Sequence, residues 1–159
     1  MSIWKFFTSS EEDKKSTLQK EIENRFPDME EERQIHLAAF SGLLARVAIA
    51  DFHIDESEEQ LFRQALKGHT QLPHEEIEFL VSFSLKNAKE LAGRENHMYC
   101  TALNESLDKD EKYEILEVLC QLAMADGKIT HEEDQELSYI ANSLRLSHQH
   151  FIAAKAAAK

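Results

Sequence analysis

A duplicated segment constrains the fold of this chain more than any other feature. Residues 44–62 and 119–137 align at a shift of 75 positions, and seven of the 19 aligned pairs are identical. Each copy joins an Ala-rich apolar segment to an acidic one through a short connector, which is Ala50-Asp51-Phe52 in the first copy and Ala125-Asp126-Gly127 in the second. Because apolar residues recur at helical spacing around each connector, the repeat predicts two helix–connector–helix units.

Composition indicates that these units belong to one all-α domain. The chain has 159 residues with only four glycines and two prolines, and good helix formers dominate it. We predict seven to eight helices, with the two repeats related by a pseudo-twofold axis. The expected organisation is a flexible or interfacial segment at 1–8, an N-terminal helix at 9–28, and the main helical domain at 29–159, with repeat 1 at about 29–92 and repeat 2 at about 108–157.

Local signals predict where some helices begin, end and approach one another. Asp28 followed by Glu31 has the spacing of a capping box at the start of the second helix. Gly68 is expected to end the helix that begins near Glu56. Gly42 and its small neighbours predict a close contact between helices, because they leave room for a partner's side chains.

Capping boxes are also predicted at the two connectors. Asp55 with Glu58, and Thr130 with Glu133, have the required spacing. In such a box the cap side chain accepts the third backbone N–H, and the glutamate carboxylate returns to the N–H of the cap residue. Both glutamates are therefore expected at the ends of their own helices.

Asp51 and Asp126 follow Ala-rich faces, where a carboxylate is costly unless it is hydrogen-bonded. One interpretation is that each aspartate accepts backbone N–H groups of its own connector and fixes the bend. Asp126→Ala would then destabilise the fold by ~1–3 kcal/mol by leaving buried donors without an acceptor.

The other interpretation is a Ca²⁺ or Mg²⁺ site built from hard oxygen ligands. Neither connector has the ligand spacing of an EF-hand, and Lys128 is unfavourable beside a cation in the second copy. The first copy is therefore the better candidate. The candidate ligands are Asp51, Asp55, Glu58 and Glu59 in the first copy and Asp126, Glu133 and Asp134 in the second.

Other functional classes find little support in the sequence. The net charge of −12 disfavours nucleic acid, which needs clustered Lys and Arg. No catalytic or phosphate-binding motif is present, and the eight histidines lack zinc-site spacing. Cys100 and Cys120 lie in apolar helical patterns without CxxC spacing, which predicts buried reduced thiols. We expect a protein without enzymatic activity or an organic cofactor.

The first seven residues differ from the rest, because Ile3, Trp4, Phe6 and Phe7 surround Lys5. One interpretation is that they dock on the core or on a neighbouring subunit. The other is a peripheral contact with anionic lipid through Trp, Phe and Lys. Because the sequence has no signal peptide and no spanning segment, we expect a cytoplasmic protein with peripheral association at the inner membrane.

The second connector, Ala123-Met-Ala-Asp-Gly-Lys-Ile-Thr-His-Glu-Glu133, resembles the TerB-like (tellurite-resistance protein B) superfamily. That superfamily includes the N-terminal domain of a membrane-anchored DnaJ-type co-chaperone. The first copy, Ala48-Ile-Ala-Asp-Phe-His-Ile-Asp-Glu-Ser-Glu58, departs from the pattern at Phe52, where Gly is usual. The resemblance covers about residues 29–157 and implies an all-helical, two-repeat, non-enzymatic domain.

The resemblance also implies a link to stress responses and tellurite resistance, association near the inner membrane, and divalent metal at the acidic positions named above. The leading functional prediction is an adaptor whose grooves bind a protein partner. The alternative is a divalent-metal-binding or metal-sensing protein.

Overall fold

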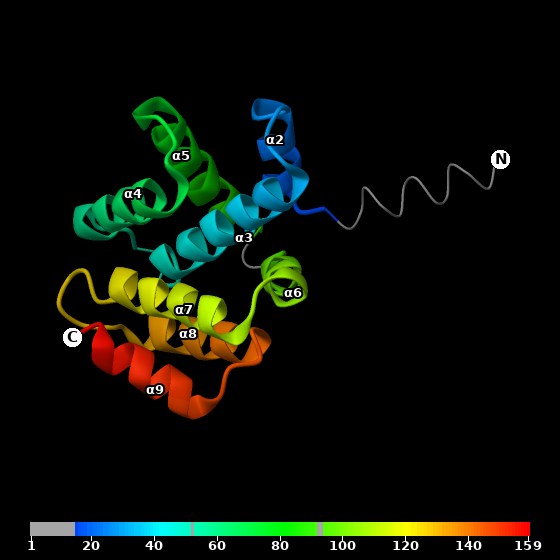
Figure 1. The fold of residues 1–159 in the computed structure, drawn as a ribbon. Coiled ribbons are helices and arrows are strands. Elements are labelled where there is room, and N and C mark those ends of the chain that lie inside the picture. Colours follow the sequence, from blue (N-terminus) through cyan, green and yellow to red (C-terminus); the bar gives the residue numbers. More distant parts are fainter. Residues whose placement is uncertain (1–14, 52, 92–93) are drawn as a thin grey trace.

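The computed structural model describes residues 15–51, 53–91 and 94–159, and in these ranges the chain forms eight α-helices and no β-strand (Figure 1). The all-α prediction of seven to eight helices is confirmed. Within these ranges no helix combines the length and the apolar character needed to cross a bilayer. The helices are α2 (Thr17–Arg25), α3 (Glu31–Ala48), α4 (Glu56–Thr70), α5 (His74–Leu91), α6 (Asn96–Ser106), α7 (Lys109–Ala123), α8 (His131–Ser143) and α9 (His148–Ala157).

Helix α3 forms the centre of the fold. In Figure 1 it crosses the molecule between α2, α4 and α5 on one side and α7 and α8 on the other. Twelve of its 18 residues are buried, because it packs against α2, α4, α5, α6, α7 and α8. Helix α3 is therefore enclosed by other helices on nearly every side.

Helix α6 approaches α3 closely at Gly42. A Cβ atom at this position would lie 2.4 Å from the ring of Tyr99 in α6, so the predicted close contact between helices is confirmed. Nearby, Arg46 Nη2 of α3 lies 3.1 Å from Glu136 Oε2 of α8, and Asn96 Nδ2 of α6 donates to Glu136 Oε1 at 2.6 Å. Together, the half-buried ion pair and the Asn96 hydrogen bond join three helices.

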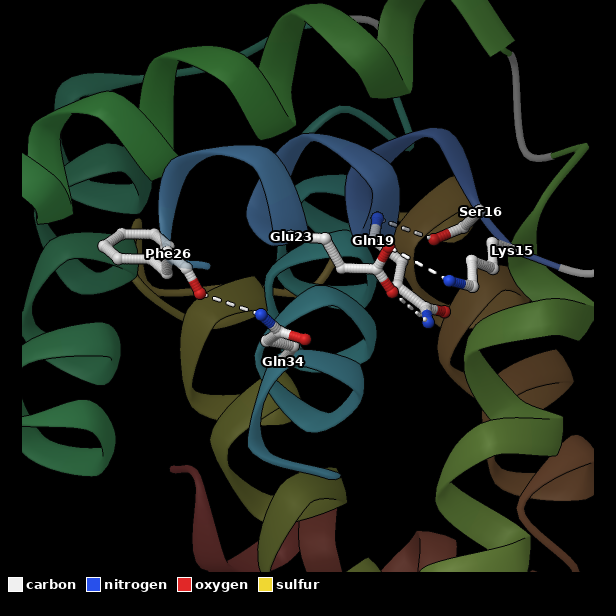
Figure 2. A network of polar contacts seen from close by, with 6 residues as sticks. All are labelled: Lys15, Ser16, Gln19, Glu23, Phe26 and Gln34. Atoms are coloured by element: carbon white, nitrogen blue, oxygen red, sulfur yellow. Dashed lines mark hydrogen bonds and ion pairs between the residues drawn. The ribbon is translucent and has the colours of Figure 1, made fainter. Parts of the chain in front are cut away.

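Helix α2 is capped at its start and joined to α3 at its end. Ser16 Oγ accepts the backbone N–H of Gln19 at 3.0 Å, and Gln34 Nε2 of α3 donates to the Phe26 carbonyl at 2.8 Å (Figure 2). Helix α2 ends at Arg25, inside the predicted range of 9–28. The predicted segment at 1–8 and the expected start of the first helix lie outside the described residues.

Two predicted helix boundaries are wrong. Helix α3 begins at Glu31 without a side-chain cap, because the N–H of Met29 bonds to the Phe26 carbonyl and keeps residues around Asp28 in a turn. Helix α4 continues past Gly68 to Thr70, whose hydroxyl donates to the Leu66 carbonyl. The left-handed residue that ends α4 is Gln71, with φ of 56°.

Candidate functional site

With their flanking residues, the two connectors span residues 49–55 and 124–130. The same kind of hydrogen bond, from a backbone N–H to an aspartate side chain, fixes the bend in each. Asp51 Oδ1 accepts the backbone N–H of His53 at 3.0 Å, and Asp126 Oδ1 accepts that of Lys128 at 3.2 Å. Each aspartate therefore fixes the bend of its own connector, as the first interpretation predicted. Gly127 has φ of +100°, a conformation that glycine adopts at little cost.

The helices after the connectors are capped as predicted, but only in part. Asp55 Oδ1 accepts the N–H of Glu58 at 2.9 Å, and Thr130 Oγ1 accepts the N–H of Glu133 at 3.1 Å. The second half of each capping box is wrong, because neither glutamate carboxylate returns to the N–H of its cap residue. Both glutamate side chains turn toward the interior instead.

The packing of α4 and α8 explains the inward turn of the glutamates. Glu58 and Phe62 lie four positions apart and share one face of α4, and Glu133 and Leu137 do the same on α8. Because Phe62 and Leu137 are fully buried, the faces that they occupy carry the glutamates inward with them. The exposed fraction is 3% for Glu58 and 1% for Glu133.

The buried carboxylates lack hydrogen-bond donors. Glu58 Oε2 and both carboxylate oxygens of Glu133 are buried without a hydrogen-bond partner in the structure. Burial, followed by the charges of Glu133 and Asp55, raises the pKa of Glu58 to about 8. Burial is also the main cause that raises the pKa of Glu133 to about 7, although the nearby Thr130 hydroxyl opposes the shift. The charges of Asp51, Asp126 and Asp55 raise the Glu133 pKa further.

Carboxylates of the two connectors meet at one place. Single oxygens of Asp55, Glu58 and Asp126 all lie within 4.8 Å of one another. Glu58 is buried, Asp55 is half-buried and Asp126 is exposed, so the cluster extends from the interior to the surface. One cation could contact ligands from both connectors, which the sequence had divided into two separate sites.

The remaining predicted ligands are divided by the structure. Asp51 and Glu133 lie near enough to this cluster for their charges to affect its pKa values. Glu59 instead pairs with Arg63 at 2.8 Å, and Asp134 pairs with Lys155 at 2.8 Å. The structure therefore brings three of the seven candidate carboxylates into one cluster, places Asp51 and Glu133 within range of its charges, and directs two into ion pairs at the surface.

The two cysteines lie outside this cluster. Cys100 and Cys120 are buried and free, and burial raises the pKa of both thiols to about 12. The predicted buried reduced thiols are confirmed, and their raised pKa disfavours the thiolate form that nucleophilic chemistry needs.

Sequence reasoning did not identify an open groove of about 310 Å³ between α3, α4, α6 and α7. Its lining includes Met29, Phe40, Leu72, Leu107 and Ile115, which come from five separate segments. A further hollow of about 200 Å³ between α4 and α7 shares His69 with this groove. Because this lining is spread over separate segments, no local sequence motif marks the groove.

Comparison with known proteins identifies one relationship. The sequence model of the family described as "Tellurite resistance protein TerB" matches residues 34–156, a range that contains both connectors and their buried glutamates. No curated protein and no solved structure matches the chain.

Proposed function

The chain belongs to the TerB family, which its name associates with tellurite resistance, and from this premise we propose that it is a non-enzymatic helical protein that binds one divalent cation between its connectors. The observation that carries the proposal is the pair of buried glutamates, one after each connector, because Glu58 Oε2 and both carboxylate oxygens of Glu133 are buried without a hydrogen-bond partner. The co-chaperone relationship remains a prediction from the sequence.

A cation accounts for these carboxylates better than a purely structural role does. A buried polar group without a partner destabilises a fold by about 1–3 kcal/mol, and a buried unpaired charge by more. The ion pairs of Glu59 and Asp134 show that this chain neutralises other carboxylates of the same helices with Arg63 and Lys155. Among the described residues, no Lys or Arg side chain forms an ion pair with Glu58 or Glu133.

The arrangement of the ligands favours Ca²⁺ over Mg²⁺. The cluster draws its oxygens from two connectors far apart in sequence and reaches the surface at Asp126. Ca²⁺ accepts six to eight oxygen ligands in flexible geometry, whereas Mg²⁺ requires a near-ideal octahedron. We propose that Asp55, Glu58 and Asp126 contact the ion and that Asp51 and Glu133 contribute charge beside it.

Calcium titration of the full chain, followed by NMR, tests the proposal. We expect resonances of both connectors to shift together with one saturation curve, and Mg²⁺ to compete weakly. The variant Glu58→Gln should lose this response. Glu59→Gln and Asp134→Asn are matched controls, because they remove acidic charge from the same two helices outside the cluster, and they should retain it. If millimolar Ca²⁺ shifts no connector resonance, the cation proposal is wrong.

A second candidate function is an adaptor in a stress or tellurite-resistance response near the inner membrane, and the groove favours it. Partner capture from the native host tests this function. An adaptor partner should be retained by the wild type and by Tyr139→Arg, which changes an exposed residue of α8, and lost by Ile115→Arg in the groove. Equal capture by all three proteins would argue against the groove.

A further inference from the structure

The groove beside α7 has an apolar surface that the described residues leave accessible. Met29, Leu72, Leu107 and Ile115 are only partly buried, although they pack against the core. The volume of about 310 Å³ lies at the lower end of the range for ligand sites. On one side His69 lies edge-on to Phe40, with 5.3 Å between the ring centroids.

The walls of the groove carry opposite charges. Arg33 and His36 of α3 line one wall, and Glu111 and Glu114 of α7 line another. Arg33 Nη2 donates to the Thr70 carbonyl at 2.8 Å, which holds the guanidinium at the groove. An occupant with an apolar face, a cation and a separate acidic stretch would complement these walls.

The first fourteen residues of the same chain have this composition. Ile3, Trp4, Phe6 and Phe7 surround Lys5, and an acidic stretch at 11–13 follows. No other stretch of the sequence places four large apolar residues around a single lysine within five positions.

The chain is long enough for these residues to reach the groove. Its described part begins beside α2, where Lys15 Nζ lies 3.1 Å from Glu23 Oε2 (Figure 2). The eight steps from Phe7 to Lys15 span up to ~26 Å in extended form. Helix α2 is only ~13 Å long, and Met29, which lines the groove, follows its other end.

We propose that residues 3–7 occupy this groove in the same molecule, with their apolar side chains against Leu72, Leu107 and Ile115. Lys5 faces Glu111 and Glu114, and the acidic stretch at 11–13 passes Arg33. This inference rests on the groove that the adaptor proposal uses. The docked segment would cover that surface, so a partner must displace it. The net charge of −12 and the acidic stretch oppose the alternative contact with anionic lipid.

Trp4 makes the proposal testable in the full chain, because it is the only tryptophan. We expect wild-type Trp4 emission to be blue-shifted and protected from iodide quenching, independently of protein concentration. The groove variants Ile115→Asn and Leu72→Asn should red-shift the emission and increase quenching several-fold. Ile152→Asn is the matched control, because Ile152 is exposed on α9, and it should leave Trp4 protected. Circular dichroism identifies any variant that fails to fold.

Three results would overturn the proposal. If iodide quenches Trp4 of the wild type as strongly as it quenches tryptophan in a short peptide, the groove does not hold this residue. Protection that appears only as the protein dimerises assigns the segment to a second copy. Protection that appears only on addition of vesicles containing phosphatidylserine assigns it to the membrane. None of these results bears on the adaptor function itself, which fails separately if no partner depends on Ile115.

Discussion

The two connectors share one backbone design and differ in charge. In both, an aspartate accepts the N–H of the residue two positions later, and a glutamate three positions into the next helix is buried. The first connector caps its helix with the carboxylate of Asp55, whereas the second uses the hydroxyl of Thr130. The second also carries Lys128, whose backbone N–H bonds to Asp126.

This difference appears in the buried glutamates. The pKa of Glu58 is raised to about 8 and that of Glu133 to about 7. Burial is the largest cause of both shifts and the charge of Asp55 adds to both, while the Thr130 hydroxyl partly offsets the second. The shared elements therefore set the backbone structure of both connectors. The cap residue, Asp55 in one copy and Thr130 in the other, sets how much negative charge each copy carries.

The largest expected effect comes from neutralising both buried carboxylates. Without calcium at pH 8, Glu58→Gln combined with Glu133→Gln should increase the free energy of unfolding by on the order of 4 kcal/mol, because two buried charges disappear. Glu58→Gln alone should stabilise more than Glu133→Gln alone. Urea unfolding in EGTA measures both differences, and equal single effects would remove the asymmetry between the copies.

The pH dependence should follow from the same two groups. The unfolded glutamates ionise near pH 4.5, whereas the folded ones stay protonated up to about pH 7 and pH 8. The folded state therefore binds more protons in this window, and stability falls as pH rises from about 5 to 8, by on the order of 6 kcal/mol. Saturating calcium should reduce this slope. A stability that rises across the window in EGTA would contradict the raised pKa values.

Exchanging the cap residues isolates their charge, because Asp and Thr both cap helices well. Asp55→Thr should weaken calcium binding roughly tenfold, or about 1.4 kcal/mol, because it removes one proposed ligand. Thr130→Asp should strengthen binding and destabilise the calcium-free protein. Isothermal titration of the two variants measures this. Changes of the same sign in both would show that the caps act through backbone structure and not through charge.

The smallest effect is expected for Asp126→Ala without calcium. The sequence alone predicted a loss of ~1–3 kcal/mol, on the assumption of buried donors. Asp126 and Lys128 are exposed in the structure, so water can replace the lost bond, and the loss should stay below ~1 kcal/mol. Thermal unfolding with Asp51→Ala in parallel tests this. A larger loss at Asp126 would mean that its connector is more buried in solution.

Local patterns predicted much of the fold because they act through neighbouring residues. The hydrogen bonds of the connector aspartates and of the N-caps Asp55 and Thr130 all lie within three positions. The capping-box pattern failed at Glu58 and Glu133 for the opposite reason. Their carboxylates follow the faces that Phe62 and Leu137 bury, and the partners of those faces lie on other helices.

The sequence by itself determined the helices, their duplicated connectors and the family. It also contained every carboxylate of the candidate site. Only the tertiary structure decided that Asp126 meets Asp55 and Glu58 in one cluster. It also decided that Glu59 and Asp134 form ion pairs with Arg63 and Lys155 instead. Residues about 70 positions apart meet because α4, α7 and α8 all pack on α3, and that packing depends on the shapes of whole helices rather than on any motif.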